Sequence, residues 1–172
     1  MLSRKLMAFG IAYGVSLSGM AFAETLTSDF NVLMVVKPKC SLMETTIGDI
    51  NLAEHEAGAA NIKGSTQFAV LCTKTTPYAI SLTPSNASSS GQGTLRGANQ
   101  ANTETISYSL YKDAAMSEVW GNQADPGGNQ QAGTGNPDGT TSVNHTVYAK
   151  VPVLGNLFPD TYKDRVTVTI TY

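Results

Sequence analysis

Apolar and polar residues alternate one by one along several stretches of this chain. The clearest stretch is the last one, where Val166, Val168, Ile170 and Tyr172 interleave with an arginine and threonines. Because successive side chains of a β-strand point to opposite sides, a period of two predicts strands with one buried face. Four other alternating stretches are predicted as strands on the same ground: residues 68–72, 78–82, 106–110 and 147–151.

Polar segments rich in Gly, Asn, Ser and Pro separate these stretches, which are themselves rich in Val, Ile, Thr and Tyr. Short strands of this composition between turn residues predict an all-β sandwich or barrel. Residues 84–97 and 121–142 are expected to be polar connections, the second a long exposed loop. The single candidate helix is short, near residues 52–60.

The first residues have the composition of an export signal. Arg4 and Lys5 precede the mostly apolar stretch Leu6–Met20, and Ala21-Phe22-Ala23 follows it. A charged start, an apolar stretch and small residues at the end predict a secretory signal peptide, cleaved after Ala23. A membrane anchor is the alternative, but glycines and serines interrupt the stretch, and a spanning helix needs about 20 mainly apolar residues. No later segment is predicted to span a membrane.

The mature chain, residues 24–172, has the length of one domain. Loss of Arg4 and Lys5 moves the net charge from −2 to −4. A mildly acidic chain without basic clusters in its sequence does not suggest a nucleic-acid partner. Cys40 and Cys72 remain, and export to an oxidising compartment predicts one disulfide between them, the alternative being two buried free thiols.

No motif for catalysis, a metal or a cofactor stands out in the sequence. The histidines, His55 and His145, are far apart and lack neighbours typical of metal ligands. Asp125 and Asp138 lie in glycine-rich turns where calcium is conceivable, although turn chemistry explains them more simply. We therefore expect no enzyme, no cofactor and no metal site.

A second long alternating segment, residues 26–36, follows the predicted cleavage site. One interpretation is an ordinary first strand of the same sandwich, since sequential strands usually pair locally. The other is a strand donated to a neighbouring subunit, a form of β-augmentation. The residues that would share its apolar face are Leu26, Phe30, Val32, Met34 and Val36.

Several stretches, taken in order and spacing, resemble the spore coat U domain family, which includes Csu-type pilus subunits of the archaic chaperone–usher class. The matching stretches are residues 70–82, 106–113, 120–121, 147–152 and 162–172. The alternating run ahead of Cys40 matches in placement and period. The chain departs from the family where Ile47-Gly48 replaces a Phe-Gly pair, and around Pro159-Asp160-Thr161, where a glycine is usual.

The resemblance implies an incomplete immunoglobulin-like sandwich that lacks its last strand. Residues 1–23 would be the signal peptide, residues 24–37 the donor-strand segment and residues 38–172 the pilin domain. Cys40 and Cys72 would form the disulfide of the fold. The C-terminal strand would lie next to the acceptor groove through Val166, Val168, Ile170 and Tyr172.

The resemblance also implies partners and a location. A periplasmic chaperone would lend the missing strand, and an outer-membrane usher would exchange it for the N-terminal segment of an identical or related subunit. The leading hypothesis is a structural subunit of an extracellular fimbrium, exported through the periplasm and supporting adhesion and biofilm formation. The alternatives are a monomeric secreted sandwich that binds ligands through residues 121–142, a coat protein, and a secreted hydrolase.

Overall fold

The computed structural model describes residues 23–124 and 126–172. The chain divides into two units, Met1–Val35 and Val36–Tyr172. The described part of the first unit, residues 23–35, contains no helix or strand. The signal peptide predicted for residues 1–23 lies outside the described residues, apart from Ala23.

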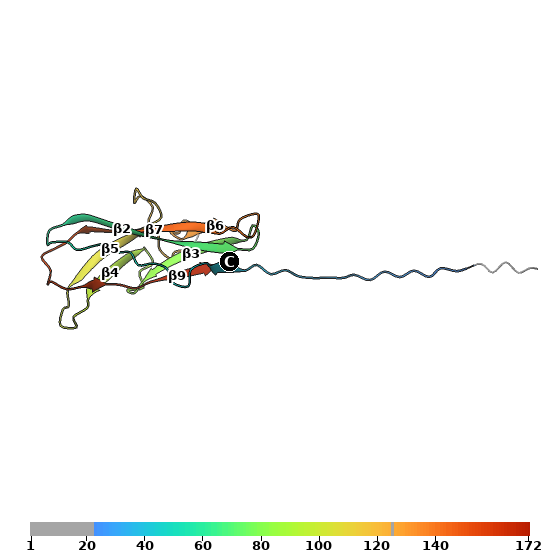
Figure 1. Cartoon of the computed structure of the whole chain (residues 1–172), viewed down its shortest axis with the longest axis horizontal. Coiled ribbons are helices and arrows are strands. Elements are labelled where there is room, and N and C mark those ends of the chain that lie inside the picture. Colours follow the sequence, from blue (N-terminus) through green and yellow to red (C-terminus); the bar gives the residue numbers. More distant parts are fainter. Residues whose placement is uncertain (1–22, 125) are drawn as a thin grey trace, which may run out of the picture. The chain divides into compact units, whose positions relative to one another are not determined.

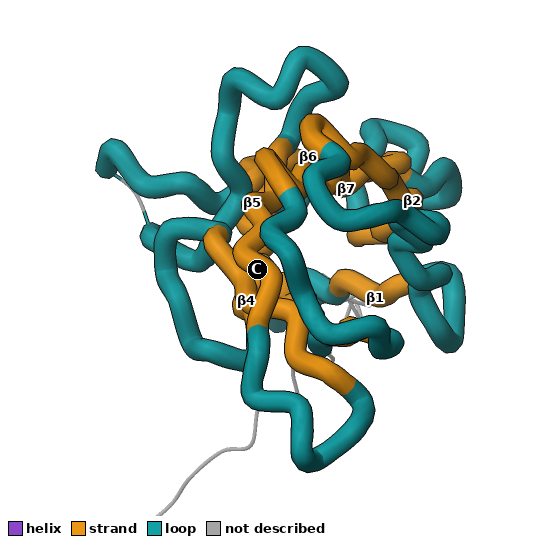
Figure 2. Tube along the Cα trace, turned by 90° about the vertical axis from the view of Figure 1, so that its left-hand side faces the viewer, coloured by secondary structure: helices purple, strands orange, loops and turns teal. Residues whose placement is uncertain are grey.

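The second unit consists of β-strands and connecting loops. Figure 2 shows strands and loops but no helix among the described residues. No described helix is long and apolar enough to cross a membrane. The strands are β1 (Cys40–Leu42), β2 (Ala60–Cys72), β3 (Pro77–Pro84), β4 (Gln92–Gly97), β5 (Thr105–Tyr111), β6 (Gln131–Thr134), β7 (Val143–Val153), β8 (Tyr162–Lys163) and β9 (Val166–Thr171).

These strands form two antiparallel sheets. The larger sheet has the order β1-β2-β7-β5-β4-β8, and the smaller has the order β6-β3-β9. The longest pairing joins β2 to β7, which run side by side in Figure 1. Two antiparallel sheets around one core form a sandwich of the immunoglobulin-like kind. The predicted all-β, immunoglobulin-like class is therefore confirmed.

The core lies between the sheets and is built from the alternating positions that the sequence marks. Residues of even number on β2, β3 and β5 and of odd number on β7 point inward. Trp120 is also fully buried, although it lies next to the isolated bridge residue Val119 rather than in an alternating stretch. Its indole Nε1 donates a hydrogen bond to the Ile80 carbonyl oxygen at 2.9 Å, so the one buried indole N–H has a partner.

The helix expected near residues 52–60 is absent, so that expectation was wrong. Residues 52–58 are irregular, and β2 begins at Ala60. Ala53 has a φ of 63°, a left-handed conformation in which a right-handed helix cannot continue. The Asn51 side chain accepts a hydrogen bond from the Ala53 amide at 2.8 Å, which favours this turn locally.

The two expected polar connections each contain a strand. Within residues 84–97, β4 pairs with β5 and places Leu95 opposite Ile106. Within residues 121–142, β6 pairs with the edge of β3, and Asn129 is buried. Both strands are short, and β6 has no large apolar residue, so their sequences carried little alternation to detect.

Candidate functional site

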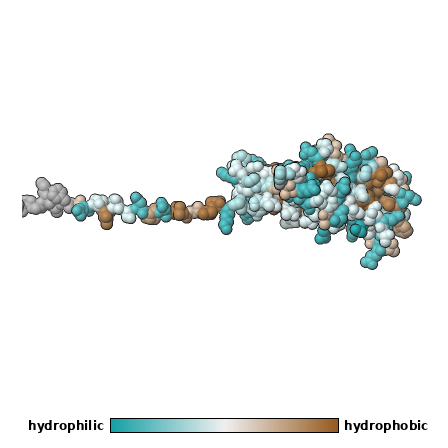
Figure 3. All heavy atoms as spheres, turned by 180° about the vertical axis from the view of Figure 1, so that it is seen from behind, coloured by the Kyte–Doolittle hydropathy of each residue, from teal (hydrophilic) through white to brown (hydrophobic). Residues whose placement is uncertain are grey.

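The N-terminal segment, defined as residues 24–36, presents its apolar side chains to solvent. Leu26 is 98% exposed, and Phe30, Val32 and Met34 are 86–87% exposed. In the space-filling view, hydrophobic atoms follow one another along this part of the chain (Figure 3). So many large exposed apolar side chains in one short segment indicate an interaction surface, since isolated ones are ordinary but clusters are not.

The last part of the segment is apolar on both of its faces. Leu33 and Val35, which fall between the alternating positions, are 88% and 84% exposed. An extended strand would carry them on the side opposite Val32 and Met34. Neither residue belongs to the apolar face that the alternation predicts. The uninterrupted run Val32–Val36 is the signal that would have drawn attention to them.

Strand β9 is an edge strand with one partner. It pairs with β3 from Ala79↔Thr171 to Pro84↔Val166, and no described strand pairs with its other side. An edge strand presents unpaired backbone N–H and C=O groups that can accept a further strand. The structure places the predicted β9 residues on one face. Val166, Val168 and Ile170 are half-buried against the core, while Tyr172 is 54% exposed.

The segment after β1 follows the edge of β2 with few ladder bonds. The β1–β2 pairing ends at Leu42↔Val70, after which the Glu44 carboxylate accepts a hydrogen bond from the Ala69 amide at 3.0 Å. Farther along, the Thr66 hydroxyl donates to the Gly48 carbonyl oxygen at 2.7 Å. Ile47, Ile50 and Leu52 of this segment are partly buried against the core.

These contacts give the core two incompletely covered borders, one formed by β9 and the other by residues 43–52. Leu42 and Met43, at the start of the second border, are 37% and 54% exposed. The β9 border follows an alternating stretch of sequence, whereas residues 43–52 lack the alternation of a strand. We call the free side of β9, with Val166, Val168 and Ile170, the acceptor edge.

Two hollows on the surface of the folded unit contain no residue of the acceptor edge. One, of about 480 Å³, is open and is lined by Lys37, Thr73, Lys74 and Asp138 among others. A second, of about 410 Å³, is lined by loop residues on either side of Val119. Neither includes a residue of β9. At β9 the described residues form an edge with a half-buried apolar row.

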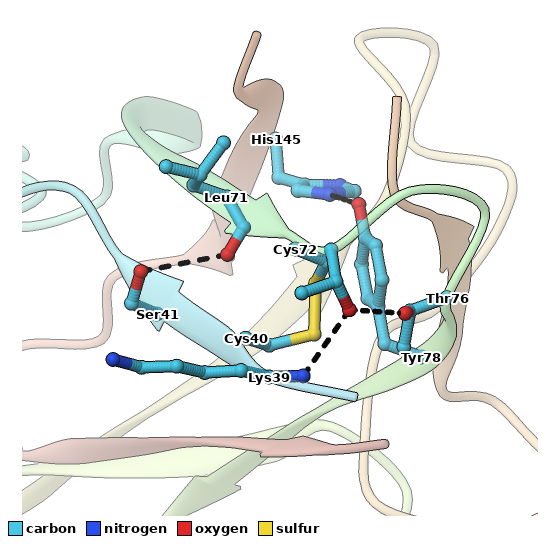
Figure 4. Close-up of a disulfide and its surroundings, with 9 residues drawn as sticks. Lys39, Cys40, Ser41, Leu71, Cys72, Thr76, Tyr78 and His145 are labelled. Carbon is cyan, nitrogen blue, oxygen red and sulfur yellow. Dashed lines mark hydrogen bonds between the residues drawn. A yellow bond between two sulfur atoms is a disulfide. The ribbon is translucent and has the colours of Figure 1, made fainter. Parts of the chain in front are cut away.

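A disulfide fixes the base of the N-terminal segment. Cys40 and Cys72 face each other across β1 and β2 and are bonded, which confirms the predicted pair (Figure 4). The Thr73 amide donates to the Lys39 carbonyl oxygen at 2.9 Å, and the Lys39 amide donates to the Thr73 hydroxyl at 3.2 Å. Covalent and hydrogen bonds together hold the chain in place directly before β1 begins.

An aromatic cluster lies beneath this anchor. His145 on β7 is 9% exposed, and its Nε2 atom lies 2.9 Å from the Tyr78 hydroxyl on β3 (Figure 4). Its ring centroid is 5.8 Å from those of Phe68 and Tyr78 and 6.3 Å from that of Trp120. Burial lowers the pKa of His145 and raises that of Tyr78. His145 is therefore a neutral core residue that joins the two sheets.

A second polar link reaches the start of β9. The Tyr108 hydroxyl on β5 donates to the Asp164 carboxylate at 2.7 Å. Burial alone would raise the pKa of Asp164, but hydrogen bonds from Ser85 and Tyr108 hold the pKa below its usual value. Burial, together with the carboxylate, raises the pKa of Tyr108. A charged Asp164 thus ties the large sheet to the residues that lead into the acceptor edge.

No group of three or more potential metal ligands occurs within residues 23–124 and 126–172. Of the two aspartates considered for calcium, Asp125 lies outside the described residues. Asp138 accepts hydrogen bonds from the Thr140 and Thr141 amides at 2.8 Å, and hydrogen bonds from Thr141 lower its pKa to about 2. Its carboxylate is engaged in a turn of its own loop.

Two solved structures resemble the chain at low sequence identity. One is a chain of the CsuC–CsuE chaperone–tip adhesion subunit pre-assembly complex of archaic chaperone–usher Csu pili from Acinetobacter baumannii, with 18% identity, a TM-score of 0.49, and coverage of 80% of this chain and 40% of that one. The other is from a chaperone–tip adhesin complex of CFA/I fimbriae biogenesis, with 18% identity, a TM-score of 0.44, and coverage of 78% and 41%. This chain spans about two fifths of each.

Sequence matches are stronger and cover most of the chain. Protein U of Myxococcus xanthus is 30% identical over 163 residues, which covers 88% of both chains. The Spore Coat Protein U domain matches residues 26–169, from the N-terminal segment to near the end of β9. The chain belongs to the Spore Coat Protein U domain family.

Proposed function

We propose that this chain is a structural subunit of a bacterial surface fibre, in which residues 24–36 of one copy complete the sandwich of the next. Membership of the Spore Coat Protein U domain family indicates a structural, non-enzymatic protein. The observation that carries the proposal is that one chain contains both a strand-like segment without a partner and a strand edge without a partner. An alternating apolar segment is almost fully exposed, and an edge strand with a half-buried apolar row lacks a second partner.

Donor-strand exchange satisfies both features at once. Backbone groups of the incoming segment would pair with the free side of β9, and Leu26, Phe30, Val32, Met34 and Val36 would enter the core between β9 and residues 43–52. Burying each large apolar side chain contributes roughly 1.5–3 kcal/mol. Backbone bonds supply affinity and the side-chain spacing supplies register.

The domain boundaries proposed from the sequence suit this assembly. Residues 1–23 direct export, residues 24–37 are donated, and residues 38–172 form the receiving body. The Cys40–Cys72 bond then lies where the donated segment joins its own body. Tension along a fibre would pass through this junction, and a covalent link between β1 and β2 would resist it.

Assembly of this kind requires helpers, and the family resemblance implies which ones. A periplasmic chaperone would cover the acceptor edge before polymerisation, because an exposed edge strand with an apolar row promotes aggregation. An outer-membrane usher would catalyse the exchange. The product would be an extracellular fimbrium, and adhesion and biofilm formation are the roles that we propose for it.

Matched substitutions in the N-terminal segment test the proposal. Phe30→Asp with Val32→Asp places two charges on the face that would be buried, whereas Thr27→Asp with Asn31→Asp places two on the opposite face. The chain and both variants would be exported with the chaperone and usher, and surface material examined by size exclusion and electron microscopy. We expect the first pair to abolish fibres and the second pair to retain them.

A peptide experiment separates strand donation from other effects of these substitutions. A peptide of residues 24–36 is added to a chain that lacks this segment. We expect the peptide to raise the melting temperature of the body, because it binds only the folded state. A full-length chain that folds without helpers, remains monomeric and gains no stability from the peptide would contradict the proposal and favour a monomeric binder.

A further inference from the structure

The outward face of the larger sheet collects positive charge. Lys63 on β2, Lys150 on β7, Arg96 on β4 and Lys163 on β8 occupy positions that alternate with inward residues, so all four side chains point away from the core. Lys63, Arg96 and Lys163 are exposed and Lys150 is half-buried. We call these four residues and the outward side chains between them the basic face.

The cations of the basic face form two directly opposed pairs. Lys63 faces Lys150 across β2 and β7, and Arg96 faces Lys163 across β4 and β8. Like charges directly opposite each other in an antiparallel ladder destabilise the sheet. Two such pairs in one sheet therefore lower its stability, and a bound anion would relieve the repulsion between the cations.

Carboxylates do not balance these cations within the sheet. None of the strands in the described residues contains an aspartate or a glutamate. Two carboxylates near this face, those of Glu104 and Asp160, are hydrogen-bonded to loop residues. The Glu104 carboxylate accepts a hydrogen bond from the Phe158 amide, and that of Asp160 accepts from the Asn99 amide and the Asn102 side chain. The face is basic although the mature chain is acidic overall.

Small hydrogen-bonding side chains fill the space between the two pairs. Lys150 faces Ser109, which faces Gln92 on the next strand, and Arg96 faces Thr105. The nearest members of the two pairs, Lys150 and Arg96, are two strand spacings apart, about 10 Å, and four residues apart along the strands, about 13 Å. The other outward residues of this face are Ser65, Gln67, Thr146, Tyr148, Ser107, Tyr111 and Thr94.

We propose that the basic face binds an acidic polysaccharide, a chain of sugars that carries carboxylate groups. Each opposed pair would hold one carboxylate between two cations, and the hydroxyl and amide side chains between the pairs would hydrogen-bond to sugar hydroxyls. Widely spaced pairs suit a polymer of low charge density. Duplex DNA carries a charge about every 1.7 Å of its axis and is bound by denser basic surfaces.

This site is separate from strand exchange. The donated segment would add to β9, in the smaller sheet, whereas the basic face is the outer side of the larger sheet. Binding of the polysaccharide therefore does not depend on whether the proposed fibre forms. If the fibre forms, the face recurs in every subunit, and linked sites raise the overall affinity without new contacts.

The test compares two double variants that remove the same charge. Lys63→Gln with Lys150→Gln alters the basic face, and Lys37→Gln with Lys74→Gln alters the hollow at the base of the N-terminal segment. Binding of the mature full-length chain to immobilised polygalacturonate, dextran, duplex DNA and phosphatidylglycerol vesicles would be measured by surface plasmon resonance. Because loss of a like-charge pair stabilises the sheet, the first variant should melt at a higher temperature and remain folded.

We expect polygalacturonate to bind and dextran not to bind, with binding weakened by salt. The Lys63 and Lys150 variant should lose affinity by about tenfold or more, because charge-assisted hydrogen bonds are lost, while the Lys37 and Lys74 variant stays within about twofold. Equal binding by both variants, binding of dextran, or preference for DNA or vesicles over polygalacturonate would overturn the proposal. Fibre formation should be unaffected by the Lys63 and Lys150 variant, whose residues lie outside the donated segment and β9.

Discussion

The N-terminal segment and β9 have the same kind of sequence and opposite environments. Both alternate apolar and polar residues, yet Phe30, Val32 and Met34 are 86–87% exposed while Val166, Val168 and Ile170 pack against the core. Alternation predicts a strand with an apolar face. It does not say which surface will cover that face, whether in the same chain or in another.

The partner strand accounts for the difference. Six residue pairs join β9 to β3, and Tyr78, Ile80 and Leu82 of β3 belong to the buried core. Residues 23–35 have no pairing partner in their unit. The strand propensity of a segment is thus realised only where a neighbour supplies hydrogen bonds and packing.

The two regions can be compared most directly through one residue type. Phe68 is 1% exposed in the aromatic cluster, and Phe30 is 86% exposed in the N-terminal segment. We expect Phe68→Ala to lower the free energy of unfolding by about 3–5 kcal/mol, because it leaves a cavity beside Trp120 and His145. Phe30→Ala should leave the unfolding of the monomeric chain within about 0.5 kcal/mol of wild type.

Urea unfolding followed by Trp120 fluorescence, at a concentration where the chain is monomeric, checks both values. A large loss of stability from Phe30→Ala in the monomer would mean that the segment packs on its own body. That outcome would break the comparison between the two regions and count against strand donation.

The disulfide lies where the N-terminal segment joins the folded unit, and its removal should give the next largest loss of stability. Replacing both Cys40 and Cys72 by Ser should cost about 2–4 kcal/mol of unfolding free energy, because the unfolded chain regains the freedom of a long loop. The same urea experiment measures the loss. Binding of the peptide of residues 24–36 to the remaining folded fraction should survive, since β9 is not part of the anchor. Loss of peptide binding would place the anchor within the acceptor site.

Much of the body could be predicted from period-two alternation, because its long strands each bury one face. The alternation identified the inward positions within residues 68–72, 78–82, 106–110 and 147–151, but not Ile62 on β2 or His145 on β7. The two cysteines allowed one pairing. The short strands β4, β6 and β8 were not marked as strands in their own right. Their position in the sheets depends on backbone pairing with longer neighbouring strands. Backbone pairing does not require alternating apolar and polar side chains, so the sequence pattern does not reveal it.

Of the two borders of the candidate site, only the one formed by β9 could be predicted from the sequence. Val166, Val168 and Ile170 were identified because they alternate, whereas the border at residues 43–52 is held by side-chain-to-backbone hydrogen bonds such as that of Glu44. The opposed pairs of the basic face were also invisible in sequence, because Lys63 and Lys150 are brought together only by strand register. Residues that lie far apart in sequence need the sheet topology to become neighbours.

A tyrosine–glycine pair shows how tightly the body is packed compared with the exposed segment. Gly93 faces Tyr108, and a Cβ atom at Gly93 would lie 2.0 Å from the tyrosine ring. We expect Gly93→Ala to cost about 1–3 kcal/mol, because the ring must move and its hydrogen bond to Asp164 is strained. Gly155→Ala, with nothing within 4 Å, is the matched control. Thermal unfolding checks both, and equal melting temperatures would show that Tyr108 moves freely.

The smallest expected effect is a pH dependence that belongs to the body alone, since residues 23–35 contain no histidine. Burial lowers the pKa of His145 from 6.5, so the folded chain binds fewer protons than the unfolded chain once the pH falls below about 6.5. Stability is therefore full above this pH and declines as the pH falls toward the pKa of the folded state. His145→Gln keeps a partner for Tyr78 and should flatten the decline between about pH 6.5 and 5.

Urea midpoints measured across this range, for the full chain and for a chain without residues 24–36, check the assignment. Both chains should show the same slope, and His145→Gln should reduce the slope in both. Asp164 does not interfere, because hydrogen bonds lower its pKa below an ordinary value of 3.8 and its protonation belongs to more acidic solutions. A slope that disappears with residues 24–36 would mean that the N-terminal segment contacts the cluster around His145. The two regions would then be coupled within one chain rather than between neighbouring copies.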